Sequence, residues 1–415
     1  MRIALLSLLF PVILLSGCGP EAERVTEIPW ALTGDWLVAD IHSHSRFSDG
    51  ALTVETLVNR AVVGGCDALA ITDHGDTDEE AASPAYFDAI RKARDGHPDL
   101  VIFAGLEWNI PPYGGREHVG VLVDPAREAD LLSELKARFE AEGASAEEGL
   151  AWLRGQLADP RDAVLIYNHP SRKVDSAAES GAAMAGWRSV SPQMIGFEGA
   201  PGHQRADPLG SYRRPELTLD RWDPVAARVG GVWDDLLDQG QNIWAAVAVS
   251  DFHNDELDQP PCAFARIHVQ VPQRSARGVL RALHAGSFWA DHGGILDQLT
   301  LTVTVDGLAI PLSPGEAARV PASGPVWVNV YLQRGPGARR SPLDVELIGN
   351  VRQGGPRTLE TRTLGPDQGS VSWPFHALKA GADGKSAYIR VRVRKRSAGG
   401  PDLMAYSNPI RLILF

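Results

Sequence analysis

The chain has 415 residues, of which 44% are hydrophobic and 22% are charged. This length and composition predict about two folded domains and exclude a wholly disordered chain. The 40 basic and 52 acidic residues give a formal net charge of −12. We therefore do not expect a protein that binds nucleic acid through a broad basic surface, although a local pocket for a small phosphorylated substrate stays open. Three cysteines are too few for a disulfide scaffold in a chain of this length.

The first 18 residues have the pattern of a bacterial export signal. Met1 and Arg2 precede an apolar run over residues 3–15 that is too short to span a bilayer. The run ends in Leu15-Ser16-Gly17-Cys18, which resembles the lipobox of bacterial lipoproteins, where the cysteine becomes the acylated first residue. We expect a signal peptide over residues 1–17, lipidation of Cys18 and a tether over residues 18–29. The alternatives are a plain secretory signal and a buried N-terminal helix.

The remaining sequence holds no run of the roughly 18 apolar residues that a transmembrane helix needs. The expected protein is therefore exported and anchored to a bacterial membrane through its lipidated N-terminus. Gly19 stands where an aspartate would favour retention in the inner membrane. An outer-membrane site that faces the periplasm, or the cell surface, is favoured.

Two cysteines, Cys66 and Cys262, remain after such processing. Cys66 leads into an apolar run over residues 68–72, which is typical of a small buried hydrophobic side chain. An oxidising compartment would permit a bridge between the two cysteines. The sequence alone does not favour that bridge.

Residues 36–290 alternate short apolar runs with amphipathic stretches. The runs have the length and hydrophobicity of strands buried on both faces: residues 36–41, 68–72, 101–106, 119–123, 163–167, 194–197, 243–249 and 263–271. Helical periodicity marks stretches between them: residues 54–63, 86–93, 130–141, 225–237 and 276–284. About seven such units predict an α/β fold with a parallel, irregular (β/α)7-type barrel over residues 30–296. An open doubly wound sheet is the alternative, but no glycine-rich phosphate turn follows the first strand.

The pattern changes after residue 296. Residues 299–305 and 388–394 alternate with a period of two, and glycine and proline clusters separate further short runs between them. These features predict an all-β sandwich over residues 297–415. Within residues 388–394, the side chains of Arg390, Arg392 and Arg394 share one face, which we interpret as a solvated outer face.

Residues that ligate metals gather at the ends of the predicted strands. Five clusters lie there: His42-Ser43-His44 with Asp49, Thr72-Asp73-His74, Glu107 with His118, Asn168-His169-Pro170, and Ser250-Asp251-Phe252-His253. The C-termini of parallel barrel strands open onto one face, so these side chains would converge in one cleft. Histidine with Asp or Glu, and no thiolate, suits Zn, Mn or Fe. One such residue is more often structural, whereas five clusters at equivalent strand ends predict a metal centre.

The same series resembles the PHP (polymerase and histidinol phosphatase) domain in the order, spacing and types of its residues, from Trp36 to about Leu296. With the lipobox and a β-domain that ends in Ser407-Asn408-Pro409-Ile410, the chain also resembles the CehA/McbA-type metallohydrolases. The PHP resemblance implies two to three divalent ions. It places His42, His44, Glu107 and Asp251 around the first ion, Glu107, His118 and His169 around the second, and Asp49, His74 and His253 around the third. Some members of the family have a histidine where Asp49 stands.

Such ions imply hydrolysis by a metal-bridging hydroxide that attacks a phosphorus or a carbonyl carbon. Asp251 or His253 would handle the leaving-group proton, and Asp73 would orient an imidazole or accept a proton. Two arginines near the clusters, Arg46 and Arg172, would clamp a phosphate, with a solvated loop cation as the alternative for each. The loop after residues 194–197 supplies three more candidate substrate contacts: Glu198, His203 and Arg205.

Three function classes stay open. A phosphoesterase that acts on a monoester or diester outside the cytoplasmic membrane is favoured by the arginines and the PHP resemblance. A carbamate, amide or carboxyl ester hydrolase of the carbaryl-hydrolase type is favoured by the narrower resemblance. The third class is a non-catalytic, metal-dependent surface binding lipoprotein, which the complete ligand set disfavours. The favoured interpretation implies a small phosphorylated substrate, a membrane reached through the lipid anchor, and no nucleic acid partner.

Overall fold

The computed structural model describes residues 21–112, 115–140, 143–172, 176–202, 205–206, 218 and 220–415. The expected signal peptide, the lipidation site Cys18 and the candidate substrate residue His203 lie outside these ranges. Among the described residues, no helix combines the length and apolar character needed to cross a membrane.

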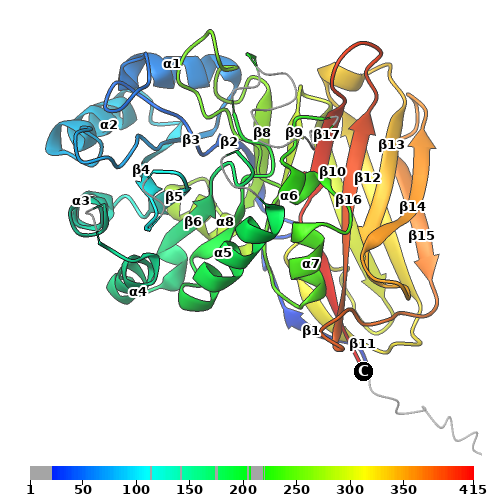
Figure 1. Ribbon diagram of the computed structural model, residues 1–415. Coiled ribbons are helices and arrows are strands. Elements are labelled where there is room, and N and C mark those ends of the chain that lie inside the picture. Colours follow the sequence, from blue (N-terminus) through cyan, green and yellow to red (C-terminus); the bar gives the residue numbers. More distant parts are fainter. Residues whose placement is uncertain are drawn as a thin grey trace, which may run out of the picture.

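The first part of the chain forms a sheet covered by helices (Figure 1). Its strands are β2 (Asp35–Asp40), β3 (Ala68–Ile71), β4 (Val101–Asn109), β5 (His118–Val123), β6 (Ala163–Tyr167), β7 (Met194–Phe197), β8 (Ala265–Val271) and β9 (Phe288–His292). They pair in the order β9-β8-β2-β3-β4-β5-β6-β7. The side chains of β3, β5, β6 and β7 are buried throughout, because helices cover the face that the core does not.

The expectation of a wholly parallel sheet is wrong. Strands β2, β3 and β4 are parallel, as are β6 and β7. Strand β5 runs antiparallel to both neighbours, and β8 runs antiparallel to β2 and β9. A continuous apolar run indicates burial on both faces but does not indicate strand direction. Strands β4 and β5 are connected by a short segment, in whose described residues no helix occurs, and they pair antiparallel.

Residues 243–249, expected to form a strand, make isolated bridges instead. Trp244 bridges Gly196 at β7, and Ala248 bridges Ala200 just after it. A few residues further on, Phe252 bridges Ser43, which follows β2. This segment therefore connects the end strand β7 with the residues that follow β2. A regular (β/α)7 ring stays a prediction.

The helices are α1 (Val54–Gly64), α2 (Pro84–Gly96), α3 (Glu128–Phe139), α4 (Ala146–Gln156), α5 (Ala177–Val190), α6 (Pro224–Ala227), α7 (Val232–Asp238) and α8 (Ala276–Ala285), with a 3-10 turn at Pro160–Asp162. Serine or threonine caps satisfy a free backbone N–H at five helix starts: Thr53, Ser83, Ser145, Ser176 and Ser275. The single helix expected over residues 225–237 is wrong. Gly230, with a φ of 73°, and Gly231 separate α6 from α7.

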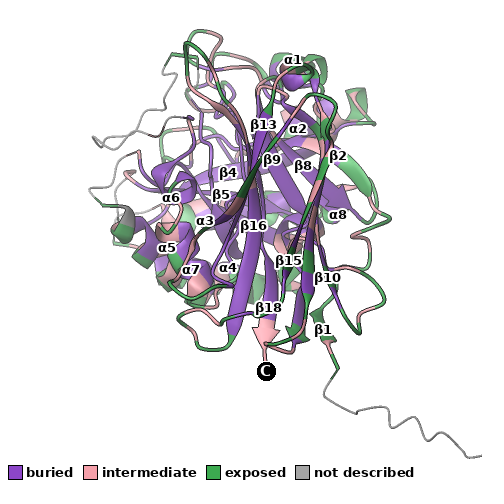
Figure 2. Ribbon diagram, turned by 90° about the vertical axis from the view of Figure 1, so that its right-hand side faces the viewer, coloured by how far each residue is buried: buried purple, intermediate pink, exposed green. Residues whose placement is uncertain are grey.

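The second part of the chain consists almost wholly of strands. Three of them form a separate sheet in the order β10 (Leu296–Val305), β12 (Val326–Arg334) and β15 (Ser370–Phe375). The others extend the main sheet: β11 (Ala317–Val320), β13 (Leu343–Gly349), β14 (Arg357–Leu364), β16 (Ser386–Lys395), β17 (Leu403–Ser407) and β18 (Ile410–Leu414), with a 3-10 turn at Pro336–Ala338. Side chains of both sheets, such as Val328 and Val391, share one core. The central strand β16 is buried along most of its length (Figure 2).

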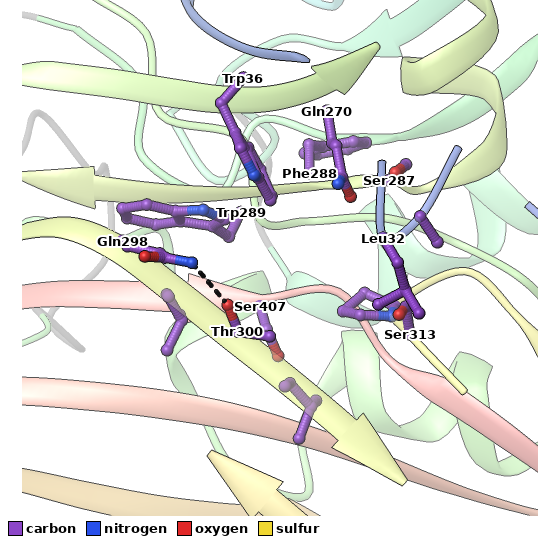
Figure 3. Close-up of a pocket in the computed structure, with 14 residues that line it drawn as sticks. Leu32, Trp36, Gln270, Ser287, Phe288, Trp289, Gln298, Thr300, Ser313 and Ser407 are labelled. Carbon is purple, nitrogen blue, oxygen red and sulfur yellow. Dashed lines mark hydrogen bonds between the residues drawn. The ribbon is translucent and has the colours of Figure 1, made fainter. Parts of the chain in front are cut away.

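The two parts share a continuous sheet. Strand β17 pairs antiparallel with β9, with Ala405 opposite Asp291 and Ser407 opposite Trp289. A cavity lies close to this junction, between β2, β9 and β10 (Figure 3). At the other end, residues Glu23–Thr26, which we expected within the tether, form β1 and pair with β11. Backbone hydrogen bonds therefore hold this part of the expected tether against the β-domain.

The interpretation of Arg390, Arg392 and Arg394 as a solvated face is wrong for the first two. Arg390 is fully buried, donates two hydrogen bonds of 2.8 Å to the Asp234 carboxylate on α7, and lies 4.3 Å from the Trp233 ring centre. Arg392 donates to Glu346 and, at 2.9 Å, to the Ala227 carbonyl of α6. Alternation of polar and apolar residues cannot distinguish a solvated face from one that meets a polar partner.

We expect Arg390→Ala to lower the free energy of unfolding by about 3–5 kcal/mol, because it leaves the buried Asp234 carboxylate with two neutral donors, Tyr388 and Gly230, but without its charged partner. Urea denaturation of the two proteins measures this difference. Arg396→Ala is the control, since the Arg396 side chain is 71% exposed although it also pairs with a carboxylate, Asp344. Equal losses in both variants would show that the buried pair adds nothing beyond a surface pair.

Candidate metal centre

Strand ends deliver the ligand-type residues to one place. His42 and His44 follow β2, His74 follows β3, and Glu107 lies near the end of β4. His118 is the first residue of β5, whose antiparallel direction puts its start beside the end of β4. His169 follows β6, and Asp251 and His253 follow the bridging segment. The predicted convergence of these residues is thus present, although β5 reaches it by its N-terminal end.

Four side-chain atoms of the first predicted group form a compact cage. The Nε2 atoms of His42 and His44 lie 3.0 Å apart. Each is 3.2 Å from Asp251 Oδ1, and they are 3.4 and 3.3 Å from Glu107 Oε2. A tetrahedral ion with ligand distances of about 2.0–2.1 Å has ligands about 3.3–3.4 Å from one another. The distance between the two imidazole nitrogens, and the distances from each nitrogen to the two carboxylate oxygens, are close to those of such a coordination shell.

The carboxylate of Glu107 is shared with a second group. His118 Nδ1 lies 3.0 Å and His169 Nε2 3.1 Å from Glu107 Oε1, and Asn168 Nδ2 donates to the same oxygen at 2.9 Å. His74 Nδ1 lies 3.1 Å from the other oxygen. The structure therefore brings His74 to Glu107 and His118 as well as to its expected third group.

The third predicted group is wider and more exposed. Asp49 Oδ2 lies 3.4 Å from His253 Nε2 and 3.7 Å from His74 Nε2, and its side chain is 50% exposed. His44 Nδ1 also faces this carboxylate, at 3.6 Å from Oδ1. His44 and His74 thus each present one ring nitrogen to the buried groups and the other to Asp49.

The hydrogen bonds at the rim of the centre orient lone pairs toward its middle. His42 Nδ1 donates to Glu198 at 2.6 Å, His118 Nε2 to the Gly115 carbonyl at 2.9 Å, and His253 Nδ1 to the Asp251 carbonyl at 2.8 Å. In the neutral imidazole the second ring nitrogen then carries a lone pair, and in each case it faces a carboxylate. A lone pair and a carboxylate repel at such distances unless a proton or a metal ion lies between them.

Two further observations fit divalent ions at this place. Glu107 Oε2 and His74 Nδ1 are buried and, among the described residues, have no hydrogen-bond partner. A buried polar atom without a partner is costly, and a bound cation would satisfy both atoms. The donor set contains imidazole nitrogen and carboxylate oxygen with no thiolate, which suits Zn, Mn or Fe. The residues present therefore fit the metal ions that the sequence implies.

The electrostatics of the centre keep some, but not all, of its side chains in their ligating forms. Burial opposes protonation of His42, His44 and His253, but nearby carboxylates raise the pKa of each ring, that of His253 to about 11. Burial would raise the pKa of Glu107, but the imidazoles of His118, His42 and His74 hold it well below its usual range. Burial lowers the pKa of His74 to about 4, and burial together with Arg172 lowers the pKa of His169 well below its usual value. Both rings are therefore neutral at physiological pH, as metal ligands must be.

Carboxylates behind the centre hold its geometry. Glu198, expected to contact substrate, is 1% exposed and instead binds His42 Nδ1 and, at 2.7 Å, the His169 backbone N–H. Asp40 accepts hydrogen bonds from the backbone N–H groups of His42 and Ser250, and so fixes the two segments that carry His42 and Asp251. We missed this role of Asp40, although its position two residues before His42 in an otherwise apolar strand was a signal.

Two other aspartates brace loops. Asp73, expected to orient an imidazole or accept a proton, accepts hydrogen bonds from Ser45 N at 2.7 Å and from the Ser45 and Ser48 hydroxyls. This placement favours a role in holding the loop after His44 over a catalytic one. Asp258, which the sequence did not single out, is buried and accepts from the His253 N–H at 2.7 Å.

The three candidate substrate arginines lie in different surroundings. Arg172 reaches the centre and donates to Asp251 Oδ2 at 2.9 Å. Arg46 is exposed, donates to the Ala51 carbonyl at 2.8 Å and lines a groove beside α1 and α2. Arg205 is exposed and binds the Asp255 carbonyl and Gln259. Of these three described arginines, only Arg172 contacts a residue of the centre.

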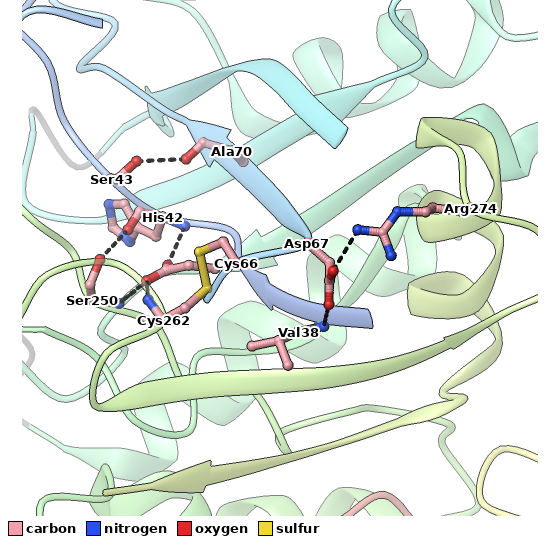
Figure 4. Close-up of a disulfide and its surroundings, with 10 residues drawn as sticks. Val38, His42, Ser43, Cys66, Asp67, Ala70, Ser250, Cys262 and Arg274 are labelled. Carbon is pink, nitrogen blue, oxygen red and sulfur yellow. Dashed lines mark hydrogen bonds and ion pairs between the residues drawn. A yellow bond between two sulfur atoms is a disulfide. The ribbon is translucent and has the colours of Figure 1, made fainter. Parts of the chain in front are cut away.

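A disulfide joins Cys66 to Cys262 beside the centre (Figure 4). This corrects the expectation that Cys66 is simply a small buried side chain. The two cysteines are 196 residues apart in sequence, with a Cα–Cα distance of 5.4 Å. The bridge ties the turn after α1 to the loop that follows His253, and the Cys262 N–H donates to Asp40. The bridge forms only because the fold brings the segment around Cys262 next to β2. A pattern of neighbouring residues in the sequence could not reveal it.

Comparison with known proteins finds a family match over the segment that carries most residues of this centre. Residues 40–169 match the PHP domain family model. The chain is 40% identical over 110 residues to the 5'-3' exoribonuclease Rnm of Salmonella typhimurium, which is 26% of this chain and 36% of that protein. It is 51% identical over 49 residues to Rnm of Escherichia coli, covering 12% and 16%. The chain thus spans about a third or less of the length of these relatives.

Two solved structures are similar at low identity. One is a two-domain protein from Bacteroides vulgatus that contains a predicted PHP-like metal-dependent phosphoesterase, with 15% identity and a TM-score of 0.43, covering 92% of this chain and 97% of that one. The other is an amidohydrolase from Chromobacterium violaceum with bound sulfate, with 18% identity and a TM-score of 0.32, covering 60% and 96%.

We expect Glu198→Gln to weaken binding of Zn or Mn by ~10–100-fold, because the residue that orients His42 loses its charge while every ligand-type side chain stays in place. Titration against a fluorescent chelator measures the affinity. Glu128→Gln is the control, since Glu128 is also buried but pairs with Arg94 away from the centre. Unchanged affinity in Glu198→Gln would show that the hydrogen bond does not position His42.

Proposed function

We propose that the protein is a metal-dependent phosphoesterase. The observation that carries this proposal is the cage formed by His42, His44, Glu107 and Asp251, with Arg172 directly beside it. We assign the first ion to this cage, the second to Glu107, His118 and His169, and a third to Asp49, His74 and His253. The matching PHP domain over residues 40–169 supports a metal-dependent hydrolase.

Arg172 is the group that favours a phosphate ester over other esters. Its Nη1 donates to Asp251, and its side chain is 13% exposed. Its Nε and Nη2 atoms are buried and have no hydrogen-bond partner among the described residues. A guanidinium with unused donors next to a metal centre can bind phosphate oxygens and hold the ester in line.

The ions would supply Lewis acidity and would lower the pKa of a coordinated water molecule. The chain itself positions the reaction. Glu198 and the Gly115 carbonyl fix the rings of His42 and His118, and Arg172 orients the phosphate and neutralises charge that develops on it. Asp251 and His253 both lie inside the centre, so we assign them as ligands and assign no separate general acid.

A 5'-3' exoribonuclease activity is the second candidate, and the observation that favours it is the 40% identity with Rnm. RNA is a phosphodiester, so the same centre could cleave it. The net charge of −12 opposes a large RNA surface, because each phosphate contact requires a basic side chain. A single-stranded 5' end needs fewer such contacts than a long duplex.

A substrate panel on metal-loaded protein tests the proposal. We expect hydrolysis of p-nitrophenyl phosphate or bis-p-nitrophenyl phosphate with Mn or Zn, and none after a chelator removes the metal. Stepwise loss of nucleotides from a 5'-phosphorylated RNA would identify the exoribonuclease instead. Aryl esters or carbamates turned over much faster than any phosphate would favour a carbaryl-hydrolase type, and inactivity on all substrates would favour a metal-dependent binding lipoprotein.

Glu107→Gln should abolish activity and lower the metal content per chain, because the neutral amide replaces the carboxylate that contacts both buried groups. Elemental analysis of the purified protein measures the metal. Glu134→Gln, at an exposed position of α3, should change neither quantity. A full complement of metal in Glu107→Gln would contradict the assignment of Glu107 as a shared ligand.

We also propose that the protein is exported and anchored through lipidated Cys18, most simply at the outer membrane. The disulfide between Cys66 and Cys262 supports export, since such bonds persist in oxidising compartments and are rare in the cytosol.

Cys18→Ala should release the protein from the membrane fraction, because the lipid is the expected anchor. Fractionation and immunoblotting measure the distribution, with Cys66→Ala as a control that keeps the anchor. Retention of Cys18→Ala in membranes would mean that another segment holds the protein.

A further inference from the structure

We propose that the outer face of the three-stranded sheet β10-β12-β15, with the cavity at its edge, binds an uncharged glycan chain. The central strand β12 places Trp327, Asn329 and Tyr331 on this face, with the two aromatic side chains 48% and 49% exposed. The alternate residues of β12, including Val328 and Val330, are buried in the sandwich core. The exposed rings are therefore a feature of one face and not of a loosely packed strand.

The neighbours of these three residues are all uncharged. Thr304 and Pro374 flank Trp327, Thr302 and Ser372 flank Asn329, and Thr300 and Ser370 flank Tyr331. Asn329 donates to the Thr304 hydroxyl at 3.2 Å and accepts from the Ser372 hydroxyl at 2.8 Å, so its amide is held flat across the sheet. We call these nine residues the aromatic face.

The two rings are spaced along the strand. A strand rises about 3.4 Å per residue, so the four steps from Trp327 to Tyr331 separate them by about 14 Å. An even number of steps keeps both on the same side of the sheet. A rigid sheet thus presents two rings with a row of hydroxyl and amide groups between them, which suits an extended ligand that spans several units.

A cavity of about 170 Å³ continues this surface at the edge of β10 that faces away from β12. Thr300 belongs to both, because it lines the cavity and pairs with Tyr331. Figure 3 shows Trp36, Gln270 and Gln298 around this space. None of its 14 lining residues is charged, although 22% of the chain is. Trp36 is 42% exposed and supplies a third accessible ring.

This chemistry matches a sugar polymer. The faces of a pyranose carry C–H groups that pack against aromatic rings, and its hydroxyls both donate and accept, as the side chains of Asn, Gln, Ser and Thr do. A phosphate polymer or an anionic lipid surface would require Lys or Arg, which the aromatic face and the cavity lack. A protein partner would require a more continuous apolar centre than two separated rings.

Affinity electrophoresis through gels that contain dextran, galactomannan, xyloglucan or laminarin tests this proposal on the mature, full-length protein. We expect at least one of these neutral glycans to retard the protein. Trp327→Ala and Tyr331→Ala should each weaken that binding at least ~10-fold, which is the loss expected for an aromatic anchor. Asn329→Asp should also abolish it, because it places a charge at the centre of the face with little change in size.

Phe415→Ala is the matched control, since Phe415 is an aromatic residue with 48% exposure outside the aromatic face. Circular dichroism confirms that each variant is folded, and phosphatase activity should be unchanged in all of them. The proposal is overturned if none of the four glycans retards the protein, if the Trp327 and Tyr331 variants bind as the parent does, or if only heparin retards it. Sedimentation that shows a dimer dissociated by Trp327→Ala would assign the face to a second copy of this chain.

Discussion

The architecture of the centre depends on one buried carboxylate. Glu107 lies within 3.4 Å of ring nitrogens from five histidines: His42, His44, His74, His118 and His169. These histidines come from four different strand ends, and Glu107 is the common point at which they meet. An ionised carboxylate in a buried place needs positive charge around it, and the ring nitrogens that surround Glu107 can supply lone pairs to a cation there. Cations between Glu107 and these ring nitrogens would stabilise the arrangement. The charge of Glu107 and the surrounding ligand atoms therefore point to the same metal site.

Carboxylates that contact the ligand-bearing segments explain how the geometry of the centre is maintained. Asp40, Glu198 and Asp73 each bind backbone or hydroxyl donors on segments that are distant in sequence. Two ligand-type residues, His169 and Asp251, have positive φ values of 31° and 46°. Non-glycine residues adopt this conformation only when their surroundings enforce it, and such positions concentrate at functional sites. Neighbouring hydrogen bonds, such as that from His169 N–H to Glu198, hold these segments in place.

The features that could be predicted from the sequence are those that depend on residues close together in the chain. Features that depend on contacts between distant residues became visible only in the structure. The strand-end histidines were predictable because residue type and position after an apolar run are both local. The helix and strand periods likewise placed α1, α8 and β6 within a few residues. Four features were not predictable: the direction of β5, the burial of Arg390 against Asp234, the hydrogen bond of Glu198 to His42, and the Cys66–Cys262 bridge. Each depends on a partner that no local pattern identifies, from an adjoining strand to a cysteine 196 residues away.

The pairing of β17 with β9 has a mechanical consequence. A sheet that runs through both parts of the molecule leaves no hinge between them, because bending there would break backbone hydrogen bonds at a buried junction. The metal centre and the β-domain are therefore held in a fixed orientation relative to each other. A ligand bound to the β-domain would therefore determine the direction in which the metal centre faces.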